Sequence, residues 1–143
     1  MTKFGGTLFP RAERDFYPTP NAVADVLARH LPPFQFFAEP CAGNGALQDR
    51  LAFYGHACTE SSDIAPQREG IARMDALAWI ADPMTEVIIT NPPFERRLMH
   101  AMINHLSDQR PTRLLLDCGW WPTHQAAPFF PRLREIVSVG RVR

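Results

Sequence analysis

The sequence predicts an α/β domain built on a mostly parallel sheet with helices on both faces. Segments that favour strands alternate along the chain with segments whose apolar residues recur at helical spacing. The clearest strand covers residues 86–90, and its continuous apolar centre is typical of a strand buried on both faces. With 143 residues, of which 45% are hydrophobic, the chain can build one core but not two, so we expect a single domain over residues 1–143.

The elements before the sheet and at its centre follow from local signals. Residues 21–31 carry apolar side chains at helical spacing, begin at Asn21 as a candidate cap and end before two prolines. A buried strand is expected over residues 34–38, so residues 1–33 form the segment and helix that precede the sheet. The glycine-rich stretch CAGNG follows, and then a helix over residues 46–54.

The rest of the chain continues the alternation. We expect strands over residues 57–61, 70–74, 86–90 and 112–116, helices over 95–106 and around 124–133, a helical turn at 76–80, and a last strand beginning near Ile136. In parallel sheets, ligands bind beyond the carboxyl ends of the strands, where the strand order reverses. The chemical motifs of this chain all fall at such ends.

Charge and hydropathy leave the partner open but predict the compartment. Fifteen basic and fifteen acidic side chains cancel, although the last dozen residues are locally basic, with Arg132, Arg134, Arg141 and Arg143. No apolar run is long enough for a signal peptide or for the roughly 20 residues of a membrane span. We therefore expect a cytoplasmic protein without membrane contact.

The three cysteines, Cys41, Cys58 and Cys118, are expected as reduced thiols, because a chain that builds its own core needs no disulfides. A metal site formed by Cys41, His56 and Cys58 is the alternative. It lacks the paired Cys-x-x-Cys spacing of zinc sites, so we expect no bound metal.

The stretch FFAEPCAGNGAL places Gly43 and Gly45 in a turn between a strand and a helix. Residues without a side chain permit a positive φ there and let a ligand approach the backbone N–H groups. A dinucleotide fingerprint requires a third small residue where this chain has Gln48, so NAD and FAD are disfavoured.

Two aspartates follow the next two strands. Asp63, twenty positions after Gly43, suits a carboxylate that accepts hydrogen bonds from ribose hydroxyls. Asp75 is placed to meet an adenine amino group. Either aspartate alone could also be a helix cap or a turn residue. The two together, in this order after a glycine turn, favour a cofactor that contains adenosine.

Residues 90–97, TNPPFERR, follow the clearest strand and predict a rigid turn. Pro92 and Pro93 fix their own φ, lack an N–H and push the residues before them into extended geometry. The Asn91 side-chain carbonyl and the Pro92 main-chain carbonyl can then accept both hydrogens of a planar NH2 group, which frees its lone pair. Phe94 offers a face on which the attached ring stacks. The alternative is a structural turn with Phe94 in the core.

Together these motifs resemble the S-adenosylmethionine-dependent amino-methyltransferases, and most closely the small phage-type DNA adenine N6-methyltransferases, over nearly the whole chain. The segment FYPTPNAVADVL matches the family's stretch before the first strand, and AEPCAGNGAL is similar to its cofactor loop. The resemblance implies a Rossmann-like class I methyltransferase fold, with S-adenosylmethionine as the cofactor.

The resemblance also implies a role for each motif. Thr19 and Pro20 lie near the methionine end of the cofactor, Glu39 lies near its ammonium group, and loop 41–45 contacts it through the backbone. Asp63 binds the ribose hydroxyls. The implied cofactor site comprises Thr19, Pro20, Glu39, Pro40, Cys41, Ala42, Gly43, Asn44, Gly45, Asp63, Ile64, Asp75, Ala76 and Asn91, and the implied catalytic tetrad comprises Asn91, Pro92, Pro93 and Phe94.

The implied substrate is adenine in duplex DNA, flipped out of the helix, in a bacterial cell or a phage-infected host. Related tetrads occur in RNA and glutamine methyltransferases, so these activities stay open, as does a cofactor-binding subunit without catalysis. The chain has no room for a separate target-recognition domain, and the family's C-terminal hairpin is incomplete. We therefore expect either a truncated chain or a second copy or another partner chain that completes the sheet.

Three further pairs of residues have less specific interpretations. Trp120 and Trp121 either line the substrate pocket or pack under the following helix. The pair His100 and His105, five positions apart, is expected on the solvated face of a helix. The adjacent arginines of the ERR sequence either contact phosphates beside the target base or are ordinary charges of a helix surface.

Overall fold

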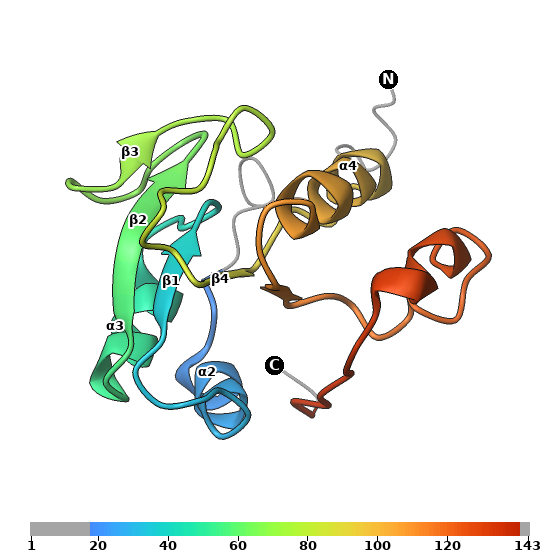
Figure 1. The fold of residues 1–143 in the computed structure, drawn as a ribbon, viewed down its shortest axis with the longest axis horizontal. Coiled ribbons are helices and arrows are strands. Elements are labelled where there is room, and N and C mark those ends of the chain that lie inside the picture. Colours follow the sequence, from blue (N-terminus) through green and yellow to red (C-terminus); the bar gives the residue numbers. More distant parts are fainter. Residues whose placement is uncertain (1–17, 141–143) are drawn as a thin grey trace, which may run out of the picture.

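A five-stranded parallel sheet forms the centre of the molecule (Figure 1). The computed structural model describes residues 18–140, so Phe16 and Tyr17 of the predicted N-terminal motif, and Arg141 and Arg143, lie outside the described residues. The strand order is β3-β2-β1-β4-β5, and every neighbouring pair is parallel, which confirms the predicted sheet. The strands are β1 (Phe36–Glu39), β2 (Ala57–Asp63), β3 (Ala72–Arg73), β4 (Val87–Thr90) and β5 (Thr112–Leu114).

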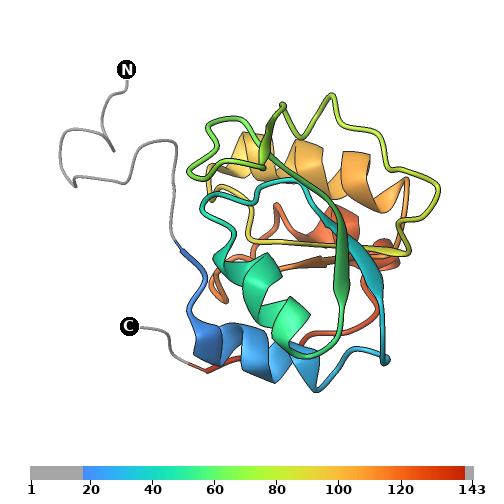
Figure 2. The same ribbon diagram turned by 90° about the vertical axis from the view of Figure 1, so that its left-hand side faces the viewer.

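Helices cover both faces of this sheet, as predicted. They are α2 (Asn21–Ala28), α3 (Ala46–Phe53), α4 (Arg96–Ser107) and a short 3-10 helix, η2 (Ala127–Arg132). Helices α2 and α3 lie side by side on one face (Figure 2), and α4 lies on the other (Figure 1). Alternate residues of the central strands enter two different cores, because successive side chains of a strand point to opposite faces. Phe37 and Ile89 pack with Leu51 of α3, whereas Ile88 packs with Leu106 of α4.

Two elements near the start of the sheet differ from their predicted bounds. β1 begins at Phe36, because Phe34 has a φ of 54°, in the left-handed region that a strand does not contain. Helix α2 ends at Ala28, three residues earlier than predicted, and its N-cap is Pro20 rather than Asn21. Neither change moves the loop that follows β1.

Two predicted helical segments are shorter than their apolar spacing indicates. Residues 76–78 form one turn, closed by hydrogen bonds from the Ala78 and Trp79 N–H groups to the Asp75 and Ala76 carbonyls, and the Asp75 carboxylate accepts the Leu77 N–H at 2.9 Å at its start. Within the predicted helix over residues 124–133, only residues 127–132 are helical, and they form a 3-10 helix. Two prolines in this stretch lack the N–H that an α-helix needs.

The predicted strand near Ile136 is wrong for the part of the chain that the structure describes. Residues 133–140 contain neither helix nor strand, and Ile136 is exposed. The segment instead meets β5 through side chains, since Glu135 forms an ion pair with Arg113 at 3.2 Å. β5 is therefore an edge strand of the sheet formed by residues 18–140.

The packing of α4 onto the sheet predicts a large effect of one truncation. Leu106 is fully buried and packs in one cluster with Ile88 and Trp79. Leu106→Ala is expected to lower the free energy of unfolding by about 2 to 5 kcal/mol, because it removes buried methyl groups and leaves a cavity. Urea denaturation measures this change. Ile80→Ala, at a site that is 69% exposed, is the control and should change stability by less than about 0.5 kcal/mol. Equal effects of the two variants would contradict the observed core.

Candidate active site

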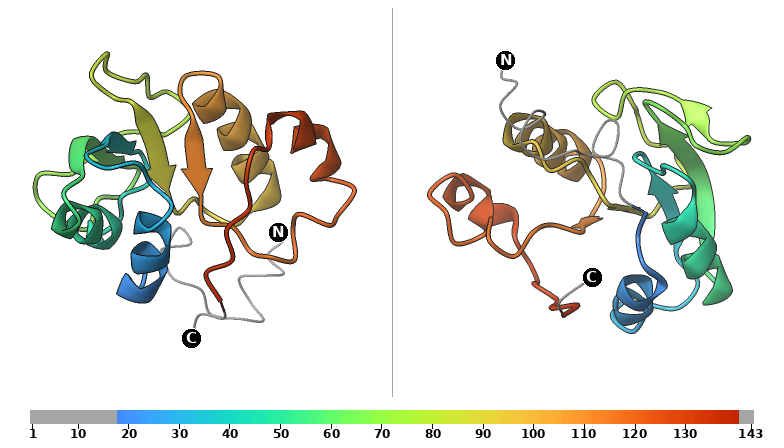
Figure 3. Two further views of the ribbon diagram at one scale, coloured as in Figure 1. Left: turned by 60° about the horizontal axis from the view of Figure 1, so that its bottom comes forward. Right: turned by 180° about the vertical axis from the view of Figure 1, so that it is seen from behind.

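The carboxyl ends of the strands lie at one edge of the sheet and carry the predicted motifs. β4 and β5 point the same way, with their ends at this edge (Figure 3). Loop 40–45 follows β1, Asp63 is the last residue of β2, and residues 91–94 follow β4 directly. Because β1 lies between β2 and β4, its loop is next to both other segments. The topology therefore brings the cofactor motif and the Asn-Pro-Pro-Phe tetrad together.

A buried carboxyl group at the end of β1 joins these segments. Glu39 is only 2% exposed, and its Oε1 accepts hydrogen bonds from the Cys41 N–H, at 3.0 Å, and from the Thr90 hydroxyl. Burial raises the pKa of Glu39 to about 8, although hydrogen bonds from Thr90, Cys41 and the Asn91 backbone oppose this shift. These contacts all lie within the protein, so a role of Glu39 toward a cofactor ammonium group stays a prediction.

The N–H groups of the glycine loop donate to acceptors of the protein itself. Ala42 donates to the Ser62 carbonyl at 2.9 Å, and Gly43 donates to the Asp63 carboxylate at 3.1 Å. Gly45 donates to the Ala42 carbonyl at 2.8 Å. Both glycines have the predicted positive φ, 56° and 83°. Because these three N–H groups already have acceptors, they are not available to bind a phosphate.

The guanidinium group of Arg68 lies close to Gly45. A Cβ atom on Gly45 would lie 2.5 Å from the guanidinium carbon of Arg68. That guanidinium is held by Asp49, with bonds of 2.6 and 3.0 Å, and the neighbouring Gln67 N–H donates to the Gly43 carbonyl at 2.9 Å. The segment after β2 therefore contacts the glycine loop. No local signal in the sequence predicts this contact.

The two predicted cofactor aspartates each stabilise a local turn. Asp63 accepts a hydrogen bond from the Ala65 N–H at 2.8 Å, and its backbone carbonyl accepts one from the Met74 N–H at 2.9 Å. The carboxylate of the exposed Asp75 accepts from the Leu77 N–H. The turn role and the cofactor role are compatible, because each carboxylate oxygen has a second lone pair.

The acidic side chains create a negative potential around Cys41. Burial and the charges of Glu39, Asp63 and Asp75 raise the pKa of the Cys41 thiol well above its ordinary value. The thiol therefore stays protonated at neutral pH and is not a nucleophile. A bound cation is favoured by the same potential. No three His, Cys, Asp or Glu side chains among residues 18–140 are arranged to hold a metal ion.

The tetrad after β4 holds its asparagine amide in a defined orientation. The Asn91 Nδ2 donates a hydrogen bond to the Thr19 hydroxyl at 3.2 Å, and Thr19 is only 8% exposed. The Asn91 side-chain carbonyl, at the other end of the same amide, is not the atom that bonds to Thr19. Pro92 is buried and Pro93 is half-buried, whereas Phe94 is 38% exposed. The alternative that places Phe94 in the core is therefore wrong.

Long-range contacts decide the roles of the tryptophans and histidines. Trp120 is buried and donates its indole N–H to His100 Nε2 at 2.9 Å, as the packing interpretation expects, whereas Trp121 is 47% exposed. The Nε2 of His105 lies 2.8 Å from the Trp79 carbonyl. Both histidines are half-buried and hydrogen-bonded, so their assignment to a solvated helix face is wrong.

The remaining predicted cofactor residues lie on the same loops and differ in exposure. Pro40 and Ala42 precede the glycines and are buried, as is Ala76. Pro20 and Asn44 are half-buried, and the Asn44 Oδ1 accepts the Ala46 N–H at 3.0 Å at the start of α3. Ile64 is exposed after β2.

Comparisons with known proteins gave no match to this chain, whether with protein-family models, curated proteins or solved structures. Within residues 18–140, no helix combines the length and the apolar character that crossing a membrane requires. Function is therefore inferred from the chemistry of the site.

The ionisation of Glu39 predicts a distinctive pH dependence of stability. Its folded pKa, about 8, lies above its ordinary value of 4.5, so the folded protein holds one more proton than the unfolded chain between these values. Stability from this group is complete below about pH 4.5 and is lost as the pH rises through about 8. Glu39→Gln keeps the shape but cannot ionise.

Urea denaturation of both proteins at several pH values measures this effect. The fall in unfolding free energy between pH 5.5 and 8.5 is expected to be greater for the wild type, by on the order of a few kcal/mol, since one pKa unit corresponds to roughly 1.4 kcal/mol. Identical pH profiles for the wild type and Glu39→Gln would show that Glu39 is not held neutral by burial.

Proposed function

We propose that this protein is an S-adenosylmethionine-dependent methyltransferase with a Rossmann-like class I fold, which methylates the exocyclic N6 amine of adenine in DNA. One observation carries this proposal. The buried Glu39 carboxyl group bonds both to the glycine loop and to the segment that holds Asn91, so the loop proposed for the cofactor and the tetrad proposed for the amine share one edge of the sheet. The switch between β1 and β4 in the strand order supports a ligand at that edge.

The chemistry of the loops favours a cationic cofactor. When bound, S-adenosylmethionine supplies a methyl group on a positively charged sulfur. The carboxylates of Asp63 and Asp75 lie at the same edge and favour positive charge, and the loop N–H groups that a phosphate would need already have acceptors. The buried Ser62 hydroxyl, directly before Asp63, has no hydrogen-bond partner among the described residues. A bound ligand can supply that partner.

The tetrad favours a planar amine as the acceptor of the methyl group. Thr19 orients the Asn91 amide, and the neighbouring Pro92 supplies a main-chain carbonyl. Two acceptors around one NH2 group favour a tetrahedral nitrogen, whose lone pair is then available for attack. In this proposal the interaction of both acceptors with the amine strengthens as positive charge develops on the nitrogen.

The exposed Phe94 favours a nucleobase over a smaller amide substrate. A flipped base loses its stacking and pairing in the duplex, which costs a few kcal/mol. Stacking on an aromatic side chain restores about 1 to 3 kcal/mol per base. At 38% exposure, the ring of Phe94 is accessible directly after the two prolines. RNA or glutamine substrates are the competing targets of the same tetrad.

The edge strand β5 favours a second candidate function, a cofactor-binding subunit that needs a partner for catalysis. Within residues 18–140, no strand pairs with the outer edge of β5. An exposed strand edge is a surface for pairing with another chain. The two candidates differ in one result: the subunit binds the cofactor but transfers no methyl group alone.

Calorimetry with S-adenosylmethionine, or with its demethylated product, is expected to show binding. Asp63→Asn should weaken binding about fivefold to a hundredfold, because a hydrogen bond to a charged group contributes roughly 1 to 3 kcal/mol. Asp82→Asn is the matched control, since Asp82 also accepts a backbone N–H, from Met84 at 2.8 Å, but precedes β4 at the opposite edge. No heat at millimolar ligand would refute the cofactor assignment.

Substitutions in the tetrad should separate methyl transfer from substrate binding. Asn91→Ala is expected to lower the single-turnover rate of tritiated methyl transfer to DNA about a hundredfold, because it removes a positioned acceptor. Phe94→Ala should chiefly weaken productive binding of DNA, about fivefold to a hundredfold. Cofactor affinity should change little in either variant. A well-folded Asn91→Ala protein with an undiminished transfer rate would show that the tetrad has a structural role and no role in methyl transfer.

A further inference from the structure

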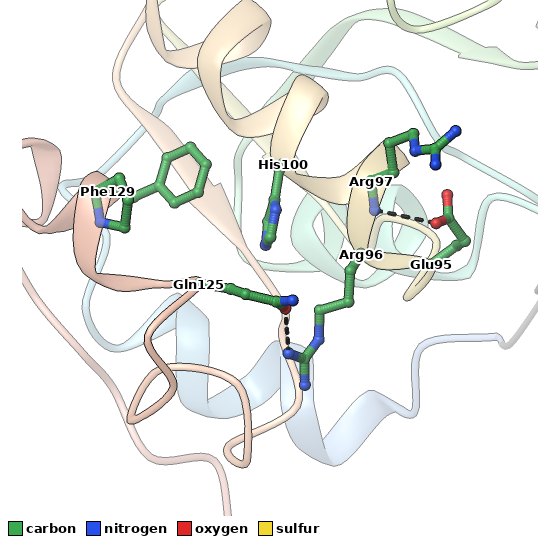
Figure 4. Close-up of a pocket in the computed structure, with 7 residues that line it drawn as sticks. Glu95, Arg96, Arg97, His100, Gln125 and Phe129 are labelled. Carbon is green, nitrogen blue, oxygen red and sulfur yellow. Dashed lines mark hydrogen bonds between the residues drawn. The ribbon is translucent and has the colours of Figure 1, made fainter.

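A shallow pocket of about 520 Å³ begins at Glu95, the residue that directly follows the tetrad. The first turn of α4 forms one wall, and the segment before and within η2 forms the other (Figure 4). The Arg96 guanidinium points toward Gln125 across the pocket and donates to its Oε1 at 2.7 Å, whereas Arg97 points away from both (Figure 4). The pocket is lined by Glu95, Arg96, Arg97, His100, Gln125, Pro128 and Phe129.

The positive charge of this pocket is not neutralised by a carboxylate among the described residues. Arg50, Arg68, Arg113 and Arg132 are each paired with an acidic side chain elsewhere in the molecule. Within residues 18–140, the partner of the Arg96 guanidinium is the neutral Gln125 amide, and no acceptor lies within bonding distance of the Arg97 guanidinium.

The one acidic side chain of the pocket is directed to the helix backbone. The two carboxylate oxygens of Glu95 accept hydrogen bonds from the backbone N–H groups of Arg97, at 3.1 Å, and Leu98, at 3.0 Å. Glu95 therefore caps α4 and forms no ion pair with either arginine. The first turn of α4 presents two guanidinium groups on opposite sides, two and three residues after Phe94.

We infer that this pocket binds the sugar-phosphate backbone of the strand that carries the target base, with one phosphodiester at Arg96 and Gln125 and a neighbouring one at Arg97. The identity of that base rests on the proposed function, but the phosphate contacts do not. Guanidinium groups suit phosphate oxygens because their donors lie in one plane. Phe94, which is 38% exposed, precedes Arg96 by two residues, and proteins that bind nucleic acid strands combine aromatic rings for the bases with cations for the phosphates.

The salt dependence of binding tests this inference. A fluorescein-labelled oligonucleotide of mixed sequence, single-stranded or duplex, is titrated with the full chain at several salt concentrations, without cofactor. The association constant falls as salt rises, so the slope of log K against log salt is negative. Arg96→Gln and Arg97→Gln are each expected to lower the magnitude of this slope by about 0.9 with duplex or about 0.7 with single strand, and the double variant by twice as much.

Arg29→Gln is the matched control for these arginine variants. Arg29 is exposed and has no carboxylate partner within residues 18–140, but it follows α2 in the connection to the amino end of β1. Its variant should keep the wild-type slope. If the two pocket variants also keep that slope, or if Arg29→Gln lowers it equally, the pocket is not a phosphate site.

Gln125 allows a test that retains both arginines. Gln125→Glu places a negative charge beside the Arg96 guanidinium and should lower the slope as Arg96→Gln does. Gln125→Ala removes only the neutral partner, so the slope should stay unchanged while affinity falls a fewfold. Equal slopes for Gln125→Glu and Gln125→Ala would overturn the contact at Arg96. All these side chains are exposed, so thermal unfolding should be unaltered.

Two competition experiments identify the class of anion. An RNA strand of the same sequence should compete with the labelled DNA, and inorganic phosphate should compete weakly, because both offer the same phosphate oxygens. An acidic peptide that competes as well as DNA would overturn the inference.

Cofactor binding is measured on the same variants and should be unchanged. Failure of S-adenosylmethionine binding with intact salt effects would refute the proposed function alone. Normal methyl transfer in the double arginine variant, with an unaltered salt slope, would refute the phosphate site alone.

Discussion

The hydrogen bonds of one buried carboxyl group hold the site together. Glu39 stands where the strand order changes direction, between the loop after β1 and the segment after β4. A buried carboxyl group is costly unless its oxygens are bonded, and here the donors come from Cys41, Thr90 and the Asn91 backbone. An apolar side chain could fill this space without ionising, but it could not fix both segments. The position of Asn91 relative to the glycine loop therefore depends on Glu39.

The site has regions of opposite charge, although the chain as a whole has no net charge. Acidic side chains lie around the glycine loop, whereas two guanidinium groups without carboxylate partners among residues 18–140 belong to the first turn of α4. Phe94 stands between these regions in the sequence. The proposed cationic cofactor and the proposed anionic strand would each lie next to complementary charge. The total of fifteen basic and fifteen acidic residues conceals this separation.

Local patterns in the sequence predict the parts of the fold that depend on local physics. Apolar periodicity predicts the alternation of strands and helices, and the glycine and proline signals place the loops after β1 and β4. Local patterns do not predict a conformation or a contact that depends on residues distant in the sequence. The sequence predicts strands that begin at Phe34 and near Ile136, but Phe34 is left-handed and the segment around Ile136 is irregular. Arg68 and Gln125 contact the site from distant segments, and neither has a local signal.

Asn91 is held from two directions, and each restraint has a different chemical character. Thr19 holds the side chain through a neutral hydrogen bond, whose strength does not change with pH in the physiological range. Glu39 holds the backbone through a group whose pKa, about 8, lies near that range. When Glu39 ionises, its bonds to the Asn91 and Cys41 N–H groups become charge-assisted and stronger, while the burial of the new charge lowers stability. A positively charged ligand at the glycine loop, such as the proposed cofactor, would favour the ionised form of Glu39, because a nearby opposite charge lowers the pKa of a carboxyl group.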